Sequence, residues 1–184
     1  MAALNLVAWA GGTGRAPLTI AITDIVGSTP MRERIGDEAM DSVLDAHSRR
    51  SRMLIAEHAG HPVKWLGDGD MSVFRTADKG LDYLLALQAD PGHPALRIRG
   101  IVHVGSVCIR KDDVDGRHVN IASRIGSANT GAEIWVSDQA MEDLNGLRAT
   151  RHSHLEWRRH AEVKLRGFDN TFTLWSLSPR ALLV

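Results

Sequence analysis

The sequence predicts an α+β fold, a ferredoxin-like α/β sandwich in which helices pack on a mainly antiparallel sheet. Apolar runs rich in β-branched residues, typical of strands, alternate with longer segments in which apolar residues recur at helical spacing. An Asp-Gly turn joins two of the short runs directly, which favours antiparallel pairing. The chain has 184 residues, of which 43% are hydrophobic, and this suits one globular domain that needs no disulfide or metal for its core.

The first predicted elements are a buried strand and a long helix. Residues 18–25 are apolar and β-branched enough for a strand inside the sheet. Residues 27–30 (Gly-Ser-Thr-Pro) then turn the chain, with a hydroxyl side chain placed to cap a helix and proline at its first position. Apolar residues continue at near-helical spacing through 31–59, so we expect one helix that ends at Gly60.

The next segment predicts a β-hairpin. Residues 63–66 and 71–74 are short apolar strands, and Gly-Asp-Gly-Asp stands between them. Asp68 is therefore expected in the turn. Asp70 follows as a further carboxylate. It would either strengthen the requirement for a bound metal ion at this turn or face water.

The remaining elements follow from the same patterns of apolar spacing and turn residues. In chain order we expect a helix over 79–87, a strand over 96–104 continued over 106–109 beyond a bulge at Gly105, a charged loop over 110–117, a helix over 119–128, a strand over 133–136, a small helix over 137–144, and closing strands near 156–165 and 171–177.

The amino-terminal segment is predicted to stand apart from the domain. The glycine-rich stretch 11–17 is typical of a flexible break, so we expect a flexible arm over 1–17 and the domain over 18–184. The apolar run 1–10 is half of the ~20 residues that span a bilayer, and no basic segment precedes it. We therefore expect no membrane span and a cytoplasmic location, and the single cysteine, Cys108, agrees with a reducing compartment.

The charge balance excludes a general affinity for polyanions. The chain has 22 Lys+Arg against 22 Asp+Glu, and its pI is near 7.1. A protein without net positive charge has no long-range field that attracts nucleic acid or an anionic membrane. We expect neither as a partner.

Two carboxylates are candidates for a metal site. Asp24 ends the first predicted strand, and Asp68 lies in the hairpin turn. If the two strands are neighbours, the carboxylates face one site, and such an oxygen pair suits Mg²⁺ or Mn²⁺ when substrate phosphates complete the shell. Considered singly, each aspartate is better explained as a cap or turn residue.

Five motifs place these aspartates in a wider pattern. The motifs are residues 23–29 (TDIVGST), 63–69 (VKWLGDG) with Phe74 shortly after, 100–104 (GIVHV), 116–125 (GRHVNIASRI) and 163–168 (VKLRGF). In this order and spacing, the sequence resembles the catalytic domain of class III nucleotidyl cyclases from about residue 18 to residue 177.

The resemblance implies a role for particular residues. Asp24 and Asp68 match the carboxylates that bind two metal ions, Mg²⁺ or Mn²⁺, in each site. Lys64 matches the lysine that selects adenine, and Asp113 matches the base-selecting aspartate, although Asp112 and Asp115 in the same loop leave the register open.

Three further residues match the family's contacts to the ribose and the phosphates. Asn120 and Arg124 match the pair that orients the ribose and stabilises the transition state, and Arg166 stands where a phosphate-contacting cation is common. Asn120 and Arg124 are four residues apart, so a helix presents them on one face. A guanidinium suits the charge that develops on the α-phosphate.

The resemblance implies an adenylate cyclase that converts ATP to 3′,5′-cyclic AMP and pyrophosphate. A lysine donor and a carboxylate acceptor match N1 and the N6 amine of adenine, whereas guanine presents the opposite pattern. In this family two catalytic domains share the sites, and because this chain carries both residue sets, a homodimer is implied. A cyclase for GTP or a pyrimidine nucleotide, and a catalytically silent dimerisation module, remain as alternatives.

Overall fold

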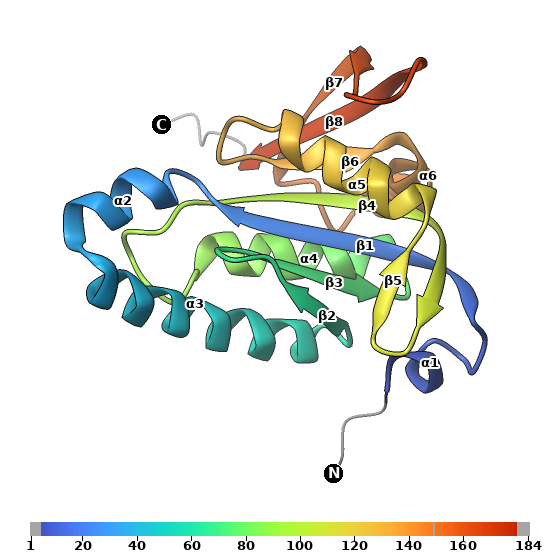
Figure 1. Cartoon of the computed structure of the whole chain (residues 1–184). Helices are drawn as coiled ribbons and strands as arrows, with labels where there is room; N and C mark the ends of the chain where they lie inside the picture. Colours follow the sequence, from blue (N-terminus) through green and yellow to red (C-terminus); the bar gives the residue numbers. More distant parts are fainter. Residues whose placement is uncertain (1–4, 149, 180–184) are drawn as a thin grey trace.

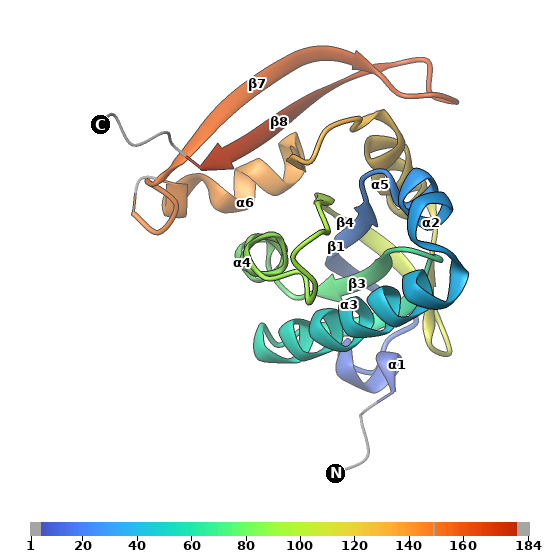
Figure 2. The same ribbon diagram turned by 90° about the vertical axis from the view of Figure 1, so that its left-hand side faces the viewer.

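The computed structural model describes residues 5–148 and 150–179, which form one sheet with helices on both faces (Figures 1 and 2). The strands are β1 (Arg15–Ile25), β2 (His61–Trp65), β3 (Asp70–Phe74), β4 (Ile98–Arg110), β5 (Asp113–Asp115), β6 (Ile134–Ser137), β7 (Leu155–Lys164) and β8 (Thr171–Pro179). The helices are α1 (Leu6–Trp9), α2 (Ser28–Ile35), α3 (Asp37–Glu57), α4 (Ala77–Ala89), α5 (Arg117–Ala128) and α6 (Asp138–Arg148).

The strand order confirms the predicted fold class. Across the described ranges the sheet runs β2-β3-β1-β4-β6-β8-β7, with β5 paired to β4. Strands β4 and β6 pair in parallel, and the other pairs are antiparallel. The chain order β1-α3-β2-β3-α4-β4, combined with the spatial order β2-β3-β1-β4, is the ferredoxin-like arrangement.

Strand β1 is buried on both faces, which explains its almost continuous apolar sequence. Ala21 and Ile25 pack into a cluster with apolar residues of α3, α4 and α6. Ile20 and Ile22 point the other way, into a cluster with α5 and α1. Figure 1 shows α5 over one face of the sheet and α3 and α4 under the other. The end of β1 is therefore fixed from both sides.

The prediction of one helix over 31–59 is wrong. Two helices, α2 and α3, meet at Gly36, whose φ of 84° lies in the left-handed region that glycine adopts without a Cβ clash. Asp37 and Glu38 then occupy the first turn of α3, where negative charge interacts favourably with the helix dipole. Apolar periodicity continues through such a one-residue break and so does not reveal it.

Strand β4 runs through Gly105 without the predicted bulge. Its pairing with β1 is continuous from Ile98 to Cys108. A Cβ on Gly105 would lie 2.1 Å from the His118 ring, so this glycine serves the close approach of α5. The predicted loop over 110–117 instead contains β5, which folds back on β4.

The amino-terminal residues differ from the flexible arm predicted over 1–17. Strand β1 begins at Arg15, and Ala16 and Pro17 pair with β4. Before it, α1 places Leu6 fully inside the second apolar cluster, and Arg75 donates to the Trp9 carbonyl oxygen while its guanidinium lies over that indole. These contacts hold α1 against the sheet because they remove its apolar side chains from water.

None of the helices in the described part of the chain combines the length and apolar character needed to cross a membrane.

Candidate active site

The two predicted metal carboxylates lie side by side. Asp24 is near the end of β1, and Asp68 is in the turn that joins β2 to β3, the strand that pairs with β1. Burial raises the pKa of Asp24, a hydrogen bond and the like charge of Asp68 raise it further, and Arg99 opposes the shift. A raised pKa of this origin is typical of two neighbouring carboxylates whose like charges repel. A divalent cation bound between them would offset that repulsion.

The hairpin turn is held tightly against β1. The backbone N–H of Leu66 donates to the Gly69 carbonyl oxygen at 2.7 Å, and the Trp65 indole donates to the Gly67 carbonyl oxygen at 2.6 Å. A Cβ on Gly69 would lie 2.0 Å from the Thr23 carbonyl oxygen and 3.0 Å from the Asp24 Cα. Glycine at this position therefore lets the turn that carries Asp68 approach the end of β1.

We expect Gly69→Ala to lower the free energy of unfolding by about 2 kcal/mol, because the new methyl group meets rigid backbone and forces the strands apart. Chemical denaturation would measure this difference. Gly126→Ala is the control, since a Cβ there lies 3.9 Å from its nearest neighbour and alanine favours helix. Equal stability of the two variants would contradict the close approach.

The structure places Asp70 in neither of the environments expected for it. The residue is 3% exposed, so it does not face water, and its side chain points away from the turn into the layer between β3, α3 and α4. Its Oδ2 accepts hydrogen bonds from Thr23, Ser51 and Tyr83. Asp70 is therefore a core residue and does not join the Asp24–Asp68 pair.

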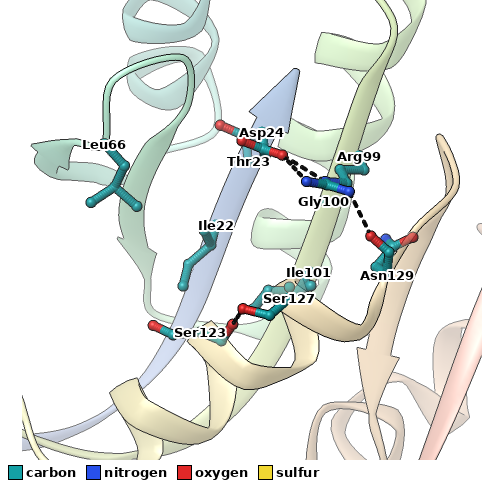
Figure 3. A pocket seen from close by; sticks show the side chains of 11 residues that line it. Ile22, Thr23, Asp24, Leu66, Arg99, Gly100, Ile101, Ser123, Ser127 and Asn129 are labelled. Atoms are coloured by element: carbon teal, nitrogen blue, oxygen red, sulfur yellow. Dashed lines mark hydrogen bonds and ion pairs between the residues drawn. The ribbon is translucent and has the colours of Figure 1, made fainter. Parts of the chain in front are cut away.

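Arg99 is a site residue that the sequence analysis missed. It lies opposite Asp24 in the β1–β4 register, donates through Nε to Asp24 Oδ2 at 2.6 Å, and pairs with the same oxygen through Nη2. Its Nη1 donates to the Asn129 carbonyl oxygen at 2.8 Å (Figure 3). The available signal was the alternation of Arg97 and Arg99 with apolar residues on a strand that enters the core.

Asp24 and Arg99 line a cavity of about 220 Å³ between β1, β4 and α5. Leu66 from the hairpin and Ser123 from α5 complete its wall, as Figure 3 shows. Asp68 does not line this cavity, but its side chain hydrogen-bonds to Asp24, which does.

Lys64 and Asp113 meet in a second, larger cavity of about 510 Å³. The Lys64 ammonium lies 2.7 Å from Asp113 Oδ1 and donates to Oδ2 at 2.9 Å. Asn120 of α5 lines the same cavity, and Leu66 and Ser123 border both cavities. Asp115 also lines it, but Asp113 is the residue that Lys64 contacts.

Arg124 and Arg166 are exposed side chains that line neither of these cavities. Arg124 is exposed on α5, one turn beyond Asn120, and lines neither of these two cavities. Arg166 is exposed in the turn between β7 and β8, near the point where Arg117 lies over the Phe168 ring. One copy of the described chain thus brings Asp24 to Asp68 and Lys64 to Asp113, but leaves Arg124 facing outward.

The donor chemistry at the carboxylates fits Mg²⁺ or Mn²⁺. Both side chains offer hard oxygen donors, and the described residues contain no group of three or more His, Cys, Asp or Glu that could hold a metal alone. Asp24 and Asp68 would therefore need further oxygen ligands, such as those that a phosphate substrate, backbone carbonyls or water can supply.

Sequence comparisons match most of the chain to known proteins. Residues 14–178 match the family described as the adenylate and guanylate cyclase catalytic domain. An adenylate cyclase of Streptomyces coelicolor is 31% identical over 131 residues, which are 69% of this chain and 34% of that protein. The chain thus spans about a third of the length of that relative.

Solved structures share the fold. The adenylyl cyclase CyaB from P. aeruginosa has a TM-score of 0.77 at 21% identity, and the match covers 91% of this chain and 97% of that one. The guanylate cyclase domain of RhGC from Catenaria anguillulae, in complex with GTP, has a TM-score of 0.73 at 17% identity, over 89% and 97% of the two chains. The resemblance to class III nucleotidyl cyclases is confirmed, and the chain belongs to the adenylate and guanylate cyclase catalytic domain family.

Proposed function

We propose that this domain is an adenylate cyclase that converts ATP to 3′,5′-cyclic AMP and pyrophosphate at sites shared across a homodimer, in the cytoplasm where ATP is supplied. The observation that carries the choice of ATP is the Lys64–Asp113 pair in the cavity that Asn120 also lines. Several similar proteins carry the name adenylate cyclase, which supports the proposal.

The Lys64–Asp113 pair would read the edge of the adenine ring. The Lys64 ammonium has only donors and would bond to N1, while an Asp113 oxygen would accept from the N6 amine. Without substrate, Lys64 and Asp113 bond to each other. Binding of adenine would break this ion pair, which costs little free energy because both side chains are exposed. Guanine presents a donor, N1–H, opposite the Lys64 donor and an acceptor, O6, opposite the Asp113 acceptor. Neither group would then form its hydrogen bond.

Asp24 and Asp68 would hold the divalent ions. When bound, the ions lower the pKa of the ribose 3′-hydroxyl and neutralise the triphosphate. Arg99 keeps the Asp24 carboxyl oriented through two contacts to one oxygen. Asn120 would orient the ribose. Arg124 and Arg166 would stabilise negative charge on the phosphate oxygens.

The outward position of Arg124 supports a dimer. The Arg124 guanidinium is exposed on α5 and does not line the cavity that Asp24 lines, and a second copy packed against that side of α5 could offer its own carboxylate pair. A two-fold arrangement makes both sites equivalent. Each site would then take Asp24 and Asp68 from one protomer and Asn120 and Arg124 from the other.

The test is to incubate the purified protein separately with ATP, GTP, CTP and UTP, each with Mg²⁺ or Mn²⁺, and to identify cyclic products by mass. Cyclic AMP from ATP alone is the expected result. Cyclic GMP would favour the second candidate, a guanylate cyclase, which is raised by the fold shared with a guanylate cyclase domain. The absence of any product at high protein concentration would favour a silent dimerisation module.

Base selection has its own expected outcome. Lys64→Ala should lower kcat/KM for ATP by about 10- to 100-fold and reduce the preference for ATP over GTP, because one hydrogen bond to adenine is lost and Asp113 loses its partner. Lys111→Ala is the matched control, since it removes the same charge from the β4–β5 turn without lining the cavity. An unchanged ATP:GTP ratio in Lys64→Ala would contradict the assignment.

A further inference from the structure

A buried carboxylate lies directly behind the metal site and has no role in the chemistry described above. Asp70, the first residue of β3, is 3% exposed. Its Oδ2 accepts hydrogen bonds from the hydroxyls of Thr23 at 2.8 Å, Ser51 at 2.9 Å and Tyr83 at 2.7 Å. Burial and the charge of Asp70 raise the pKa of the Tyr83 phenol well above its usual value, so this group remains a donor.

The hydrogen bonds join the two segments that carry the metal carboxylates. Thr23 precedes Asp24 in β1, and Asp70 follows Asp68 by two residues. The strand pairing between β1 and β3 ends at Ile22 opposite Met71, and one step further the Asp70 backbone N–H donates to Thr23 Oγ1 at 2.8 Å. Thr23 therefore bonds to both the backbone and the side chain of Asp70 and extends the strand pairing up to the carboxylates.

The remaining two donors fix this link to the helices. Ser51 comes from α3 and Tyr83 from α4, and their hydroxyls lie 3.0 Å apart. Each side chain is fully buried, so the four groups form one connected network between the sheet and its helical layer. Networks of this kind hold a single arrangement of the segments that they join.

Stability alone does not account for a carboxylate at this position. A charge in the core is costly to desolvate, and none of the donors to Asp70 is a cation. Its Oδ1 has no hydrogen-bond partner although it is buried. A buried carboxylate with an unsatisfied oxygen therefore needs an explanation other than stability.

We propose that Asp70 and Thr23 are positioning residues that hold the Asp24 and Asp68 carboxyls at the separation needed to bind metal ions together. This inference rests on the proposed function. The hydrogen bonds of Thr23 to the Asp70 side chain and backbone tie the hairpin that carries Asp68 to the end of β1 that carries Asp24. Partners behind metal ligands typically set metal affinity in this way.

The chain offers a matched pair of variants. Thr23 and Thr19 are both on β1, four residues apart, and are 2% and 1% exposed. Thr19 Oγ1 has no hydrogen-bond partner, whereas Thr23 Oγ1 makes two hydrogen bonds. Valine is close in shape to threonine, so Thr23→Val and Thr19→Val differ chiefly in the link to Asp70.

The measurement is a titration of Mn²⁺, followed by electron paramagnetic resonance, with a non-cyclisable ATP analogue present, together with thermal melting in EDTA. Thr23→Val should raise the Mn²⁺ dissociation constant about 10-fold or more, and Thr19→Val should leave it within about twofold of wild type. Tyr83→Phe, which removes one donor at a distance from the carboxylates, should raise it by a smaller factor. If Thr23→Val does not fold, the Tyr83→Phe result decides.

Two outcomes would overturn the proposal in distinguishable ways. If Thr23→Val and Tyr83→Phe melt earlier but bind Mn²⁺ as tightly as Thr19→Val, the network is structural only and the proposed cyclase stands. If the wild-type protein binds no Mn²⁺, both the metal assignment and the positioning role are wrong.

Discussion

Asp24→Asn and Asp68→Asn are each expected to lower kcat about 10³-fold or more, because a metal ion that activates the nucleophile and neutralises the leaving group supplies several kcal/mol. Both substitutions preserve side-chain size. Asparagine at position 24 can still accept from Arg99, and position 68 is a turn residue, so the fold should be retained. Cyclic AMP formation at saturating Mn²⁺, with circular dichroism for the fold, would measure the effect.

The two substitutions separate metal binding from the placement of Arg99. Asp24 contacts Arg99, whereas no contact links Asp68 to it. Loss of turnover in Asp68→Asn is therefore not a direct effect on an Arg99 contact. Asp112→Asn, an exposed carboxylate of the β4–β5 turn, is the control for a change in charge. Turnover near the wild-type level in either metal-site variant would remove the assignment.

The second large effect is expected at Arg124. Arg124→Ala should lower kcat by about 10²-fold or more and leave KM for ATP nearly unchanged, because the guanidinium meets charge that develops only in the transition state. The side chain is exposed on α5 and makes no contact that the fold requires, so stability should not change. An effect confined to KM would contradict the role.

Mixing variants tests whether Arg124 acts across a dimer. In a mixture of Asp68→Asn and Arg124→Ala chains, each heterodimer has one intact site and one doubly impaired site. With random pairing, roughly a quarter of wild-type activity should return. A mixture of Asp24→Asn with Asp68→Asn should not recover, because both changes affect the same half of the site. No recovery in the first mixture, with heterodimers confirmed by native mass spectrometry, would place each site within one chain.

The environment of Asp70 shows where reasoning from the sequence stops. In the sequence it is one of two aspartates in a Gly-Asp-Gly-Asp turn, and nothing local distinguishes it from Asp68. The distinction arises because side chains alternate along β3 and because Ser51 and Tyr83, which are distant in sequence, pack over the strand. One aspartate therefore enters the core and the other stays at the surface.

The sequence by itself determined the strand and helix pattern, the hairpin and the spacing of the cyclase motifs, because apolar periodicity and turn chemistry are local properties. Only the tertiary structure decided that Gly36 divides a helix and that Arg99 pairs with Asp24, 75 residues away. It also brought Lys64 to Asp113 across 49 residues. Such contacts depend on strand order and register, which arise from the packing of the whole chain and are not encoded in any short segment.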